Sequence, residues 1–365
     1  MDRFHRMIRP LFWARFKAWM GGVIGLGSTS LLLFAFGIAI VYTIIVILWE
    51  REAITIGAAY VAFHYVFLLY APLNQLRDQL ADLQRADAGI ARVREILGMI
   101  SGISDRGAGR LPEGALSVRA AHLTFAYPTT DSIDAMPVLQ DVGFHLDAGR
   151  ALGLLGRTGS GKTTLARLLV RLYDAPPETL EVGGVPVDGI PLGALRTGVR
   201  LIPQEVQLFH ASIRENVRLF DDSITDAIVD QVFETMGLSE WIESLPAGAD
   251  TVIGAEGIGL SAGQSQLVAL ARAFLADPGL VILDEVSSRI DPATERLLEG
   301  ALDHLLEGRT AIIIAHRLAT IARSDDVLIL EGGRVAEFGA REALARDPAS
   351  RLSRLLTAEF GGGVT

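Results

Sequence analysis

The sequence contains no cysteine, and its 365 residues include only two lysines, Lys17 and Lys162. The absence of cysteine excludes disulfides, thiolate nucleophiles and cysteine-ligated metal sites. An excess of positive charge is also missing, because 33 Lys and Arg face 43 Asp and Glu, a formal net charge of −10. Nucleic-acid partners usually require a basic face, so we expect no nucleic-acid binding. Hydrophobic residues, by contrast, make up 50% of the chain, which predicts a membrane part.

Two long stretches near the N-terminus, residues 21–49 and 53–76, contain no Asp, Glu, Lys or Arg. As helices they would extend about 44 and about 36 Å, more than the ~30 Å hydrocarbon core of a bilayer. The charged turn Glu50-Arg51-Glu52 separates them, and arginines precede the first and follow the second. We therefore expect a transmembrane hairpin with both outer ends in the cytoplasm. The alternative, a hairpin buried in a protein core, fits stretches of this length poorly.

His64 is the one ionisable residue inside the second stretch. An ionisable group in a membrane helix is a functional candidate. A neutral histidine that packs against a neighbouring helix is the alternative, and we favour it.

Composition divides the rest of the chain. The second helix is expected to continue into the cytosol as far as Leu97, which gives a transmembrane helical region over residues 1–97. The Gly-, Ser-, Asp- and Pro-containing stretch 98–114 predicts a linker. A soluble domain is expected over 115–358, and a disordered Gly-rich tail over 359–365.

Short apolar runs separated by helical segments occur throughout this domain. Such alternation predicts a mostly parallel sheet that is covered on both faces. The expected strands cover residues 116–127, 138–146, 151–155, 199–203, 280–283, 311–315 and 327–330. The stretch Glu331-Gly332-Gly333-Arg334 predicts a hairpin turn that closes a final strand pair.

The stretch 151–173 carries the clearest chemical signal. A buried-strand pattern is followed by GRTGSGKT and by an amphipathic helix with leucines spaced i, i+3, i+4, i+7 from Leu165 to Leu172. In this G-x-x-x-x-G-K-[ST] pattern, glycines let successive backbone N–H groups point at phosphates. Lys162 would supply charge to the outer phosphates, and Thr163 a hydroxyl to Mg²⁺. The expected nucleotide-binding residues here are Gly156, Arg157, Thr158, Gly159, Ser160, Gly161, Lys162, Thr163 and Thr164.

Further polar residues follow the predicted strands. Asp284 and Glu285 end an apolar strand, where Asp284 would reach Mg²⁺ and Glu285 would orient a water toward the terminal phosphate. His316 follows the strand at 311–315, where its imidazole would hydrogen-bond that phosphate. The amide oxygen of Gln204 would reach Mg²⁺. We therefore expect Glu285 and His316 to be catalytic, and Thr163, Gln204 and Asp284 to hold the metal.

The stretch 260–264, LSAGQ, resembles the signature motif of ABC transporter ATPases. The resemblance covers nearly the whole chain and implies an α/β P-loop NTPase (ABC ATPase) domain preceded by an α-helical transmembrane hairpin. It also implies family roles: Tyr127 would stack on adenine, Gln204 would be the Q-loop glutamine, Asp291 the D-loop aspartate and His316 the switch histidine.

Domains of this family work as head-to-tail dimers, with each ATP between one phosphate loop and the partner's signature helix. The resemblance therefore implies ATP and Mg²⁺ as cofactors and a second ABC subunit, identical or different, as partner. Ser261 and Gly263 would donate hydrogen bonds to the terminal phosphate bound at Lys162 of the other subunit. The signature residues expected at the nucleotide are Ser261, Ala262, Gly263 and Gln264.

The predicted hairpin, with Pro72 and the helix after it, is similar to the last two transmembrane helices of an exporter-type half-transporter. The resemblance implies an ATP-hydrolysing subunit that couples dimerisation of nucleotide domains to export. It also implies a multi-pass protein of the plasma or inner membrane with a cytoplasmic nucleotide domain. Two helices are too few for a translocation path, so additional transmembrane helices or a further chain are expected as partners.

Three positions depart from the family pattern. Ala262 stands where a glycine is usual, Ala255 where exporters have a glutamate thought to couple domains, and Arg289 in a D-loop position that is usually small and apolar. They keep open a second interpretation, in which the chain is a weakly active or regulatory subunit, or a truncated half-transporter that does not transport alone. A soluble ATPase of the chromosome-structure class would need a coiled-coil insertion between residues 163 and 260, and no heptad array occurs there.

Overall fold

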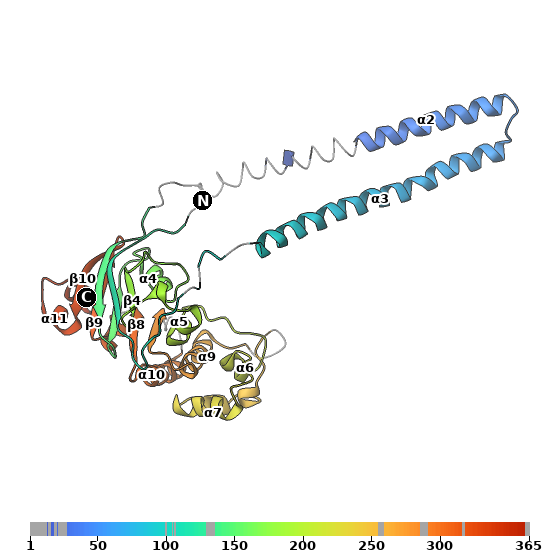
Figure 1. Ribbon diagram of the computed structural model, residues 1–365. Coiled ribbons are helices and arrows are strands. Elements are labelled where there is room, and N and C mark those ends of the chain that lie inside the picture. Colours follow the sequence, from blue (N-terminus) through green and yellow to red (C-terminus); the bar gives the residue numbers. More distant parts are fainter. Residues whose placement is uncertain are drawn as a thin grey trace. The chain divides into compact units, whose positions relative to one another are not determined.

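The computed structural model (Figure 1) describes residues 28–98, 101–103, 105, 107–128, 136–254, 259–284, 291–315 and 318–361, together with residues 13, 16, 17 and 20. The chain divides into two compact units, Met1–Ile100 and Ser101–Thr365. The division falls inside the stretch predicted as a linker.

The first unit contains a helical hairpin, formed by α2 (Ser28–Glu50) and α3 (Ile56–Leu97) (Figure 1). In the turn between them, the backbone N–H of Ala53 donates to the carbonyl of Leu48 over 2.9 Å. The hydroxyl of Thr55 caps α3 by accepting from the backbone N–H of Ala58 at 3.3 Å. α3 runs unbroken through Pro72 for 42 residues and ends at Leu97; its continuation from a membrane into the cytosol stays a prediction.

No helix in the described part of the chain is both long and apolar enough to cross a membrane. The membrane-spanning role of the hairpin therefore stays a prediction. His64, in the apolar first part of α3, stacks on the ring of Tyr60 one turn earlier, with ring centroids 6.2 Å apart and planes 9° from parallel. This contact lies within α3 itself.

The second unit is built on a six-stranded sheet of order β10-β9-β3-β8-β7-β6. Its strands are β3 (Ala151–Leu155), β6 (Val199–Ile202), β7 (Leu280–Asp284), β8 (Thr310–Ile314), β9 (Asp326–Glu331) and β10 (Arg334–Ala340). All neighbours pair in parallel except β9 and β10, which form the antiparallel hairpin expected at the end of the sheet. The predicted α/β fold is confirmed.

Successive side chains of the central strands pack alternately into two hydrophobic cores, one on each face of the sheet. In β7, Leu280 and Ile282 pack in the core that contains the helix after β3, whereas Val281 and Leu283 pack with the helices on the other face. A strand buried on both faces needs apolar side chains in both directions, which explains the continuous apolar runs in the sequence. Because they are packed on both faces, these strands fix the position of their carboxyl ends, where the site described below lies.

A second, antiparallel sheet covers part of the first face, with the order β2-β1-β4-β5. Its strands are β1 (Val118–Phe125), β2 (Leu139–Leu146), β4 (Leu180–Val182) and β5 (Val185–Pro186). Val142, Phe144 and Leu146 of β2 alternate as buried residues and share the core of the larger sheet. The sequence predicted β1 and β2 as strands, but their separation into a sheet of their own was not predicted.

The helices of the second unit are α4 (Lys162–Leu169), η2 (Val187–Gly189), α5 (Leu192–Gly198), α6 (Ile213–Arg218), α7 (Asp226–Thr235), α8 (Ser239–Glu243), η3 (Gly248–Asp250), α9 (Ala262–Leu275), α10 (Pro292–Leu306), η4 (Leu318–Arg323), α11 (Arg341–Arg346) and α12 (Arg351–Gly361). α12 includes three residues expected to open the tail. α4 packs Leu165, Leu168 and Leu169 into the core, but its predicted apolar face was one turn too long. The helix ends because Arg171 adopts a φ of +50°, and Leu172 is 46% exposed.

Candidate nucleotide site

The loop between β3 and α4 is shaped by glycines that lie against other strands. Gly156 has a φ of +148° and Gly161 a φ of +102°, conformations that side-chain-bearing residues rarely adopt. A Cβ on Gly156 would lie 2.3 Å from the carbonyl oxygen of Leu330 in β9, and one on Gly161 would lie 2.5 Å from Leu139 of β2. Since no side chain fits at either position, the pattern read from the sequence reports a real constraint on the backbone.

Lys162 and Ser160 are the two side chains of this loop that suit an anion. The Lys162 side chain is buried, and its Nζ donates to the carbonyls of Gly156 at 2.7 Å and Arg157 at 3.2 Å. Among the residues that the structure describes, the buried Oγ of Ser160 has no hydrogen-bond partner, and such an orphaned hydroxyl costs about 1–3 kcal/mol. The N-terminus of α4 adds positive potential at the same place. A phosphate oxygen would satisfy the hydroxyl and meet the ammonium group, so these residues fit a nucleotide phosphate.

A cavity of about 330 Å³ opens over the loop. It is lined by Val138, Thr158, Gly159, Ser160, Gly161, Lys162, Thr163, Thr164, Gln204 and Asp284. The structure thus brings Gln204, which follows β6, and Asp284, the last residue of β7, to the phosphate loop, because the parallel strands end at one edge of the sheet. Val138, which directly precedes β2, was missed, and no sequence signal would have singled it out.

The oxygen atoms around this cavity suit a magnesium ion. Mg²⁺ is usually held by one or two carboxylates, with substrate phosphates and waters completing an octahedron. Asp284 offers a carboxylate, Thr163 a hydroxyl and Gln204 an amide oxygen. The donor set therefore fits the expected metal without requiring a dedicated cluster of acids.

Tyr127 lies beside the start of α4 and is not among the residues that line the cavity. Its hydroxyl is 3.1 Å from the Oγ1 of Thr164 and accepts from Arg167 Nη1 at 3.4 Å. Its ring meets Phe125 and Tyr173 edge to face, with ring centroids 5.3 and 4.9 Å away. The ring is thus fixed next to the phosphate loop, and its stacking on adenine stays a prediction.

The signature residues lie at the start of α9, away from the cavity of their own chain. Ser261 and Gln264 form a capping box: Ser261 Oγ accepts from the Gln264 backbone at 3.2 Å, and Gln264 Oε1 accepts from the Ser261 backbone at 3.0 Å. Gly263 is buried, whereas Ser261 and Ala262 are exposed. A hydroxyl that accepts one hydrogen bond keeps its proton to donate, so Ser261 can still bind an outside acceptor.

Asp291 caps α10 in a similar way. Its carboxylate accepts from the backbone N–H groups of Ala293 at 3.1 Å and Thr294 at 3.0 Å. The hydrogen bond from the Thr294 backbone is the main reason that the pKa of Asp291 is lowered. Asp291 is not brought to the cavity of its own chain. Four positions singled out from the sequence lie outside the described residues: Ala255, Glu285, Arg289 and His316.

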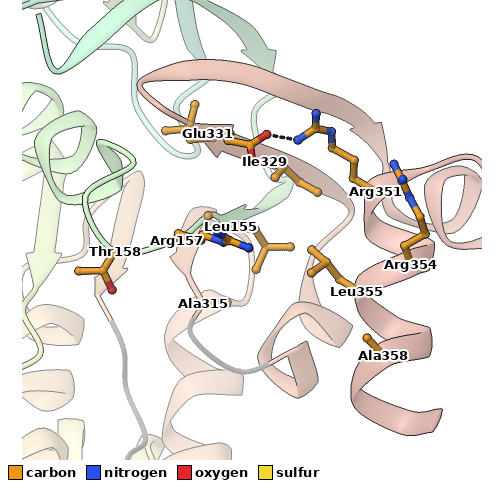
Figure 2. Close-up of a pocket in the computed structure, with 12 residues that line it drawn as sticks. Leu155, Arg157, Thr158, Ala315, Ile329, Glu331, Arg351, Arg354, Leu355 and Ala358 are labelled. Atoms are coloured by element: carbon orange, nitrogen blue, oxygen red, sulfur yellow. Dashed lines mark hydrogen bonds and ion pairs between the residues drawn. The ribbon is translucent and has the colours of Figure 1, made fainter. Parts of the chain in front are cut away.

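Gly156 and Arg157 line a second, larger groove of about 1210 Å³ (Figure 2). Its other lining residues are Leu155, Thr158, Ala315, Ile329, Leu330, Glu331, Arg351, Arg354, Leu355 and Ala358. Arg351 from α12 is paired there with Glu331 (Figure 2). Gly156 and Arg157 therefore contribute to the phosphate cavity through their carbonyls, which hold Lys162, rather than by lining it.

Comparisons with known proteins agree with this geometry. Residues 139–288 match the family model described as ABC transporter. The chain is 35% identical over 350 residues, 95% of its length and 57% of the relative's, to an ATP-dependent lipid A-core flippase of Burkholderia orbicola (strain AU 1054). It is 36% identical over 294 residues, 80% of its length, to a flippase of the same name from Yersinia pestis bv. Antiqua (strain Antiqua), of which it covers 50%.

A solved structure also shows similarity to ABC transporters. A bacterial Atm1-family ABC exporter with ATP bound superimposes with a TM-score of 0.65 at 26% identity, over 98% of this chain and 62% of that one. The chain thus spans about half the length of the curated relatives that it matches.

Proposed function

This chain carries an ABC transporter domain and is related to ABC exporters, and from that premise we propose that it is the ATP-binding and ATP-hydrolysing subunit of a membrane exporter. The observation that carries the proposal is the single cavity in which the buried Lys162, the unpartnered hydroxyl of Ser160, Gln204 and Asp284 come together. An ordinary glycine-rich turn would need neither a buried lysine nor a carboxylate from another strand.

In this proposal the chain's own residues divide the work of phosphoryl transfer. Lys162 and the N-terminus of α4 hold the phosphates, and Thr163, Gln204 and Asp284 hold Mg²⁺, which when bound neutralises developing charge on the phosphate oxygens. Glu285, directly after Asp284, orients the attacking water, and His316, directly after Ala315, donates a hydrogen bond to the terminal phosphate. Positioning and electrostatics supply most of the catalysis in this chemistry.

We also propose that the site is completed by a second ABC subunit, identical or different. Ser261 to Gln264 and Asp291 lie away from the cavity of their own chain, and Ser261 is exposed with a proton left to donate. These features support a head-to-tail arrangement, in which Ser261 and Gly263 of one subunit donate to the terminal phosphate held by the other.

Replacing Ser261 by arginine should abolish ATP-driven dimerisation of the fragment 101–365, because its bulk would fill the space left for the partner's phosphate. The fragment starts at 101, where the second unit begins. Glu285→Gln is included to block hydrolysis, and light scattering after gel filtration reports the mass. Ser261→Ala is the comparison: it loses the cap, worth about 1 kcal/mol, and the donated hydrogen bond, but it adds no bulk, so it should weaken dimerisation without abolishing it. A parent fragment that stays monomeric with ATP would count against the dimer.

The membrane arrangement is part of the same proposal. The relatives are named as ATP-dependent lipid A-core flippases and as an Atm1-family ABC exporter, and this chain covers 57%, 50% and 62% of their lengths. We propose that α2 and α3 span the plasma or inner membrane in a multi-pass assembly, with the nucleotide domain in the cytoplasm. Further transmembrane helices, on this or another polypeptide, would form the rest of the export path.

Purified 1–365 in proteoliposomes should therefore show no ATP-dependent flux of a lipid A-core probe or a drug probe above the Glu285→Gln protein. One helical hairpin per subunit cannot enclose a translocation path across the membrane. ATP hydrolysis would therefore have few transmembrane helices to rearrange. Phosphate release in the same vesicles decides between an exporter subunit and the alternative, a regulatory subunit that binds ATP without turnover. Robust vectorial flux from this chain alone would refute the need for partner helices.

A further inference from the structure

The described residues of the stretch 101–112 (101–103, 105 and 107–112), which we call the strap, contact α5 and the chain before it, within the second unit. Their composition had predicted a linker. Asp105 accepts a hydrogen bond from the backbone N–H of Leu192, the first residue of α5, at 2.8 Å. The N-cap position of α5 is Pro191, whose side chain forms no cap hydrogen bond. The Asp105 carboxylate, 87 positions away in sequence, therefore takes the role that a serine or aspartate N-cap ordinarily has, and adds favourable negative charge.

The strap holds the other end of α5 as well. A Cβ on Gly198, the last residue of α5, would lie 2.7 Å from the Cδ1 of Leu111, so the leucine packs directly on the helix backbone. Between these two contacts, the N–H of Gly109 donates to the carbonyl of Gly189 at 2.8 Å. A Cβ on Gly107 would lie 2.5 Å from that same oxygen. The strap thus follows the chain before α5 so closely that only glycine fits at 107.

α5 leads directly to the phosphate cavity. It ends at Gly198, β6 begins at Val199, and Gln204 lines the cavity just beyond the end of that strand. β6 is an edge strand that pairs only with β7, so the sheet restrains it from one side. Leu195 of α5 is fully buried, which ties the helix to the core. The position of α5 is therefore a second restraint on β6 and on Gln204.

We infer that Asp105 is a positioning residue for the ATP site, acting through α5 and β6 on Gln204. The catalytic meaning of this inference rests on the proposed function, in which Gln204 holds Mg²⁺. The strap follows α3 along the chain, with residues 98–100 between them. A displacement of the end of α3 would therefore be transmitted to α5 through the contacts of Asp105 and Leu111. The strap is then a covalent route from the helical hairpin to the nucleotide.

Hydrogen–deuterium exchange on the full chain in detergent tests the inference without requiring turnover. Asp105→Ala should raise the exchange of backbone amides over 199–206 about fivefold, the effect of losing a typical cap on a local opening. Asp105→Asn, which keeps an acceptor, should restore the parent pattern. Glu113→Ala removes an exposed acid just beyond the strap and should change nothing in 199–206.

Exchange that rises only over 101–112 and 192–198, while 199–206 keeps the parent rate, would overturn the inference and leave the strap a purely structural element. In steady-state ATPase assays, Asp105→Ala should raise the half-saturating Mg²⁺ concentration severalfold, whereas Asp105→Asn should not. If the parent chain hydrolyses no ATP, the proposed function fails, and the exchange result still decides whether the strap positions Gln204.

Discussion

Glu285→Gln should bind ATP as tightly as the parent chain and hydrolyse it on the order of 10²–10³-fold more slowly. The substitution keeps the size of the side chain but removes the carboxylate that we expect to orient the water. The residue before it in the sequence, Asp284, ends β7 at the cavity, which supports this assignment. Phosphate release measures turnover, and titration with a fluorescent ATP analogue measures binding.

A matched control for this variant is Glu299→Gln, which neutralises an exposed glutamate on α10 and should leave both quantities unchanged. Parent-level turnover in Glu285→Gln would show that another group orients the water. Loss of binding would instead show that the substitution disturbs the phosphate loop.

Lys162→Ala should weaken ATP binding itself by about 10–100-fold, the range expected for losing one charged hydrogen-bond donor. The ammonium group is buried and held by the carbonyls of Gly156 and Arg157, so it is already oriented within the loop. Turnover at saturating ATP should fall as well. Binding is again measured by titration with the fluorescent analogue.

The chain offers an unusually simple control, because Lys17 is its only other lysine. Lys17→Ala removes the same charge far along the chain from the phosphate loop and should keep parent affinity. Parent affinity in Lys162→Ala would contradict the nucleotide site. The two variants also separate two steps, since Glu285→Gln should bind ATP normally and hydrolyse it slowly, whereas Lys162→Ala should bind ATP weakly.

Much of the site was predictable because its elements are local in the sequence. Gly156 and Gly161 are required by positive φ angles within one loop, and Asp284 is the last residue of a five-residue strand. The ends of helices and strands were less predictable. Leu172 continues the apolar spacing of α4, yet it is exposed because the positive φ of Arg171 stops the helix before it. The spacing of apolar residues does not predict the backbone conformation of a single residue, and that conformation ends the helix here.

The sequence by itself determined the phosphate loop, the individual strands of the sheet and the helical hairpin, because each depends on contacts or periodicities within a short segment. Only the tertiary structure decided which distant segments meet. It placed Gln204 and Asp284 in one cavity, left Ser261 at an exposed helix start, and brought Asp105 to the first turn of α5. These pairings join residues far apart in the chain, and the free energy that selects them comes from packing of the whole core. No periodic pattern in the sequence indicates which of these distant segments contact one another.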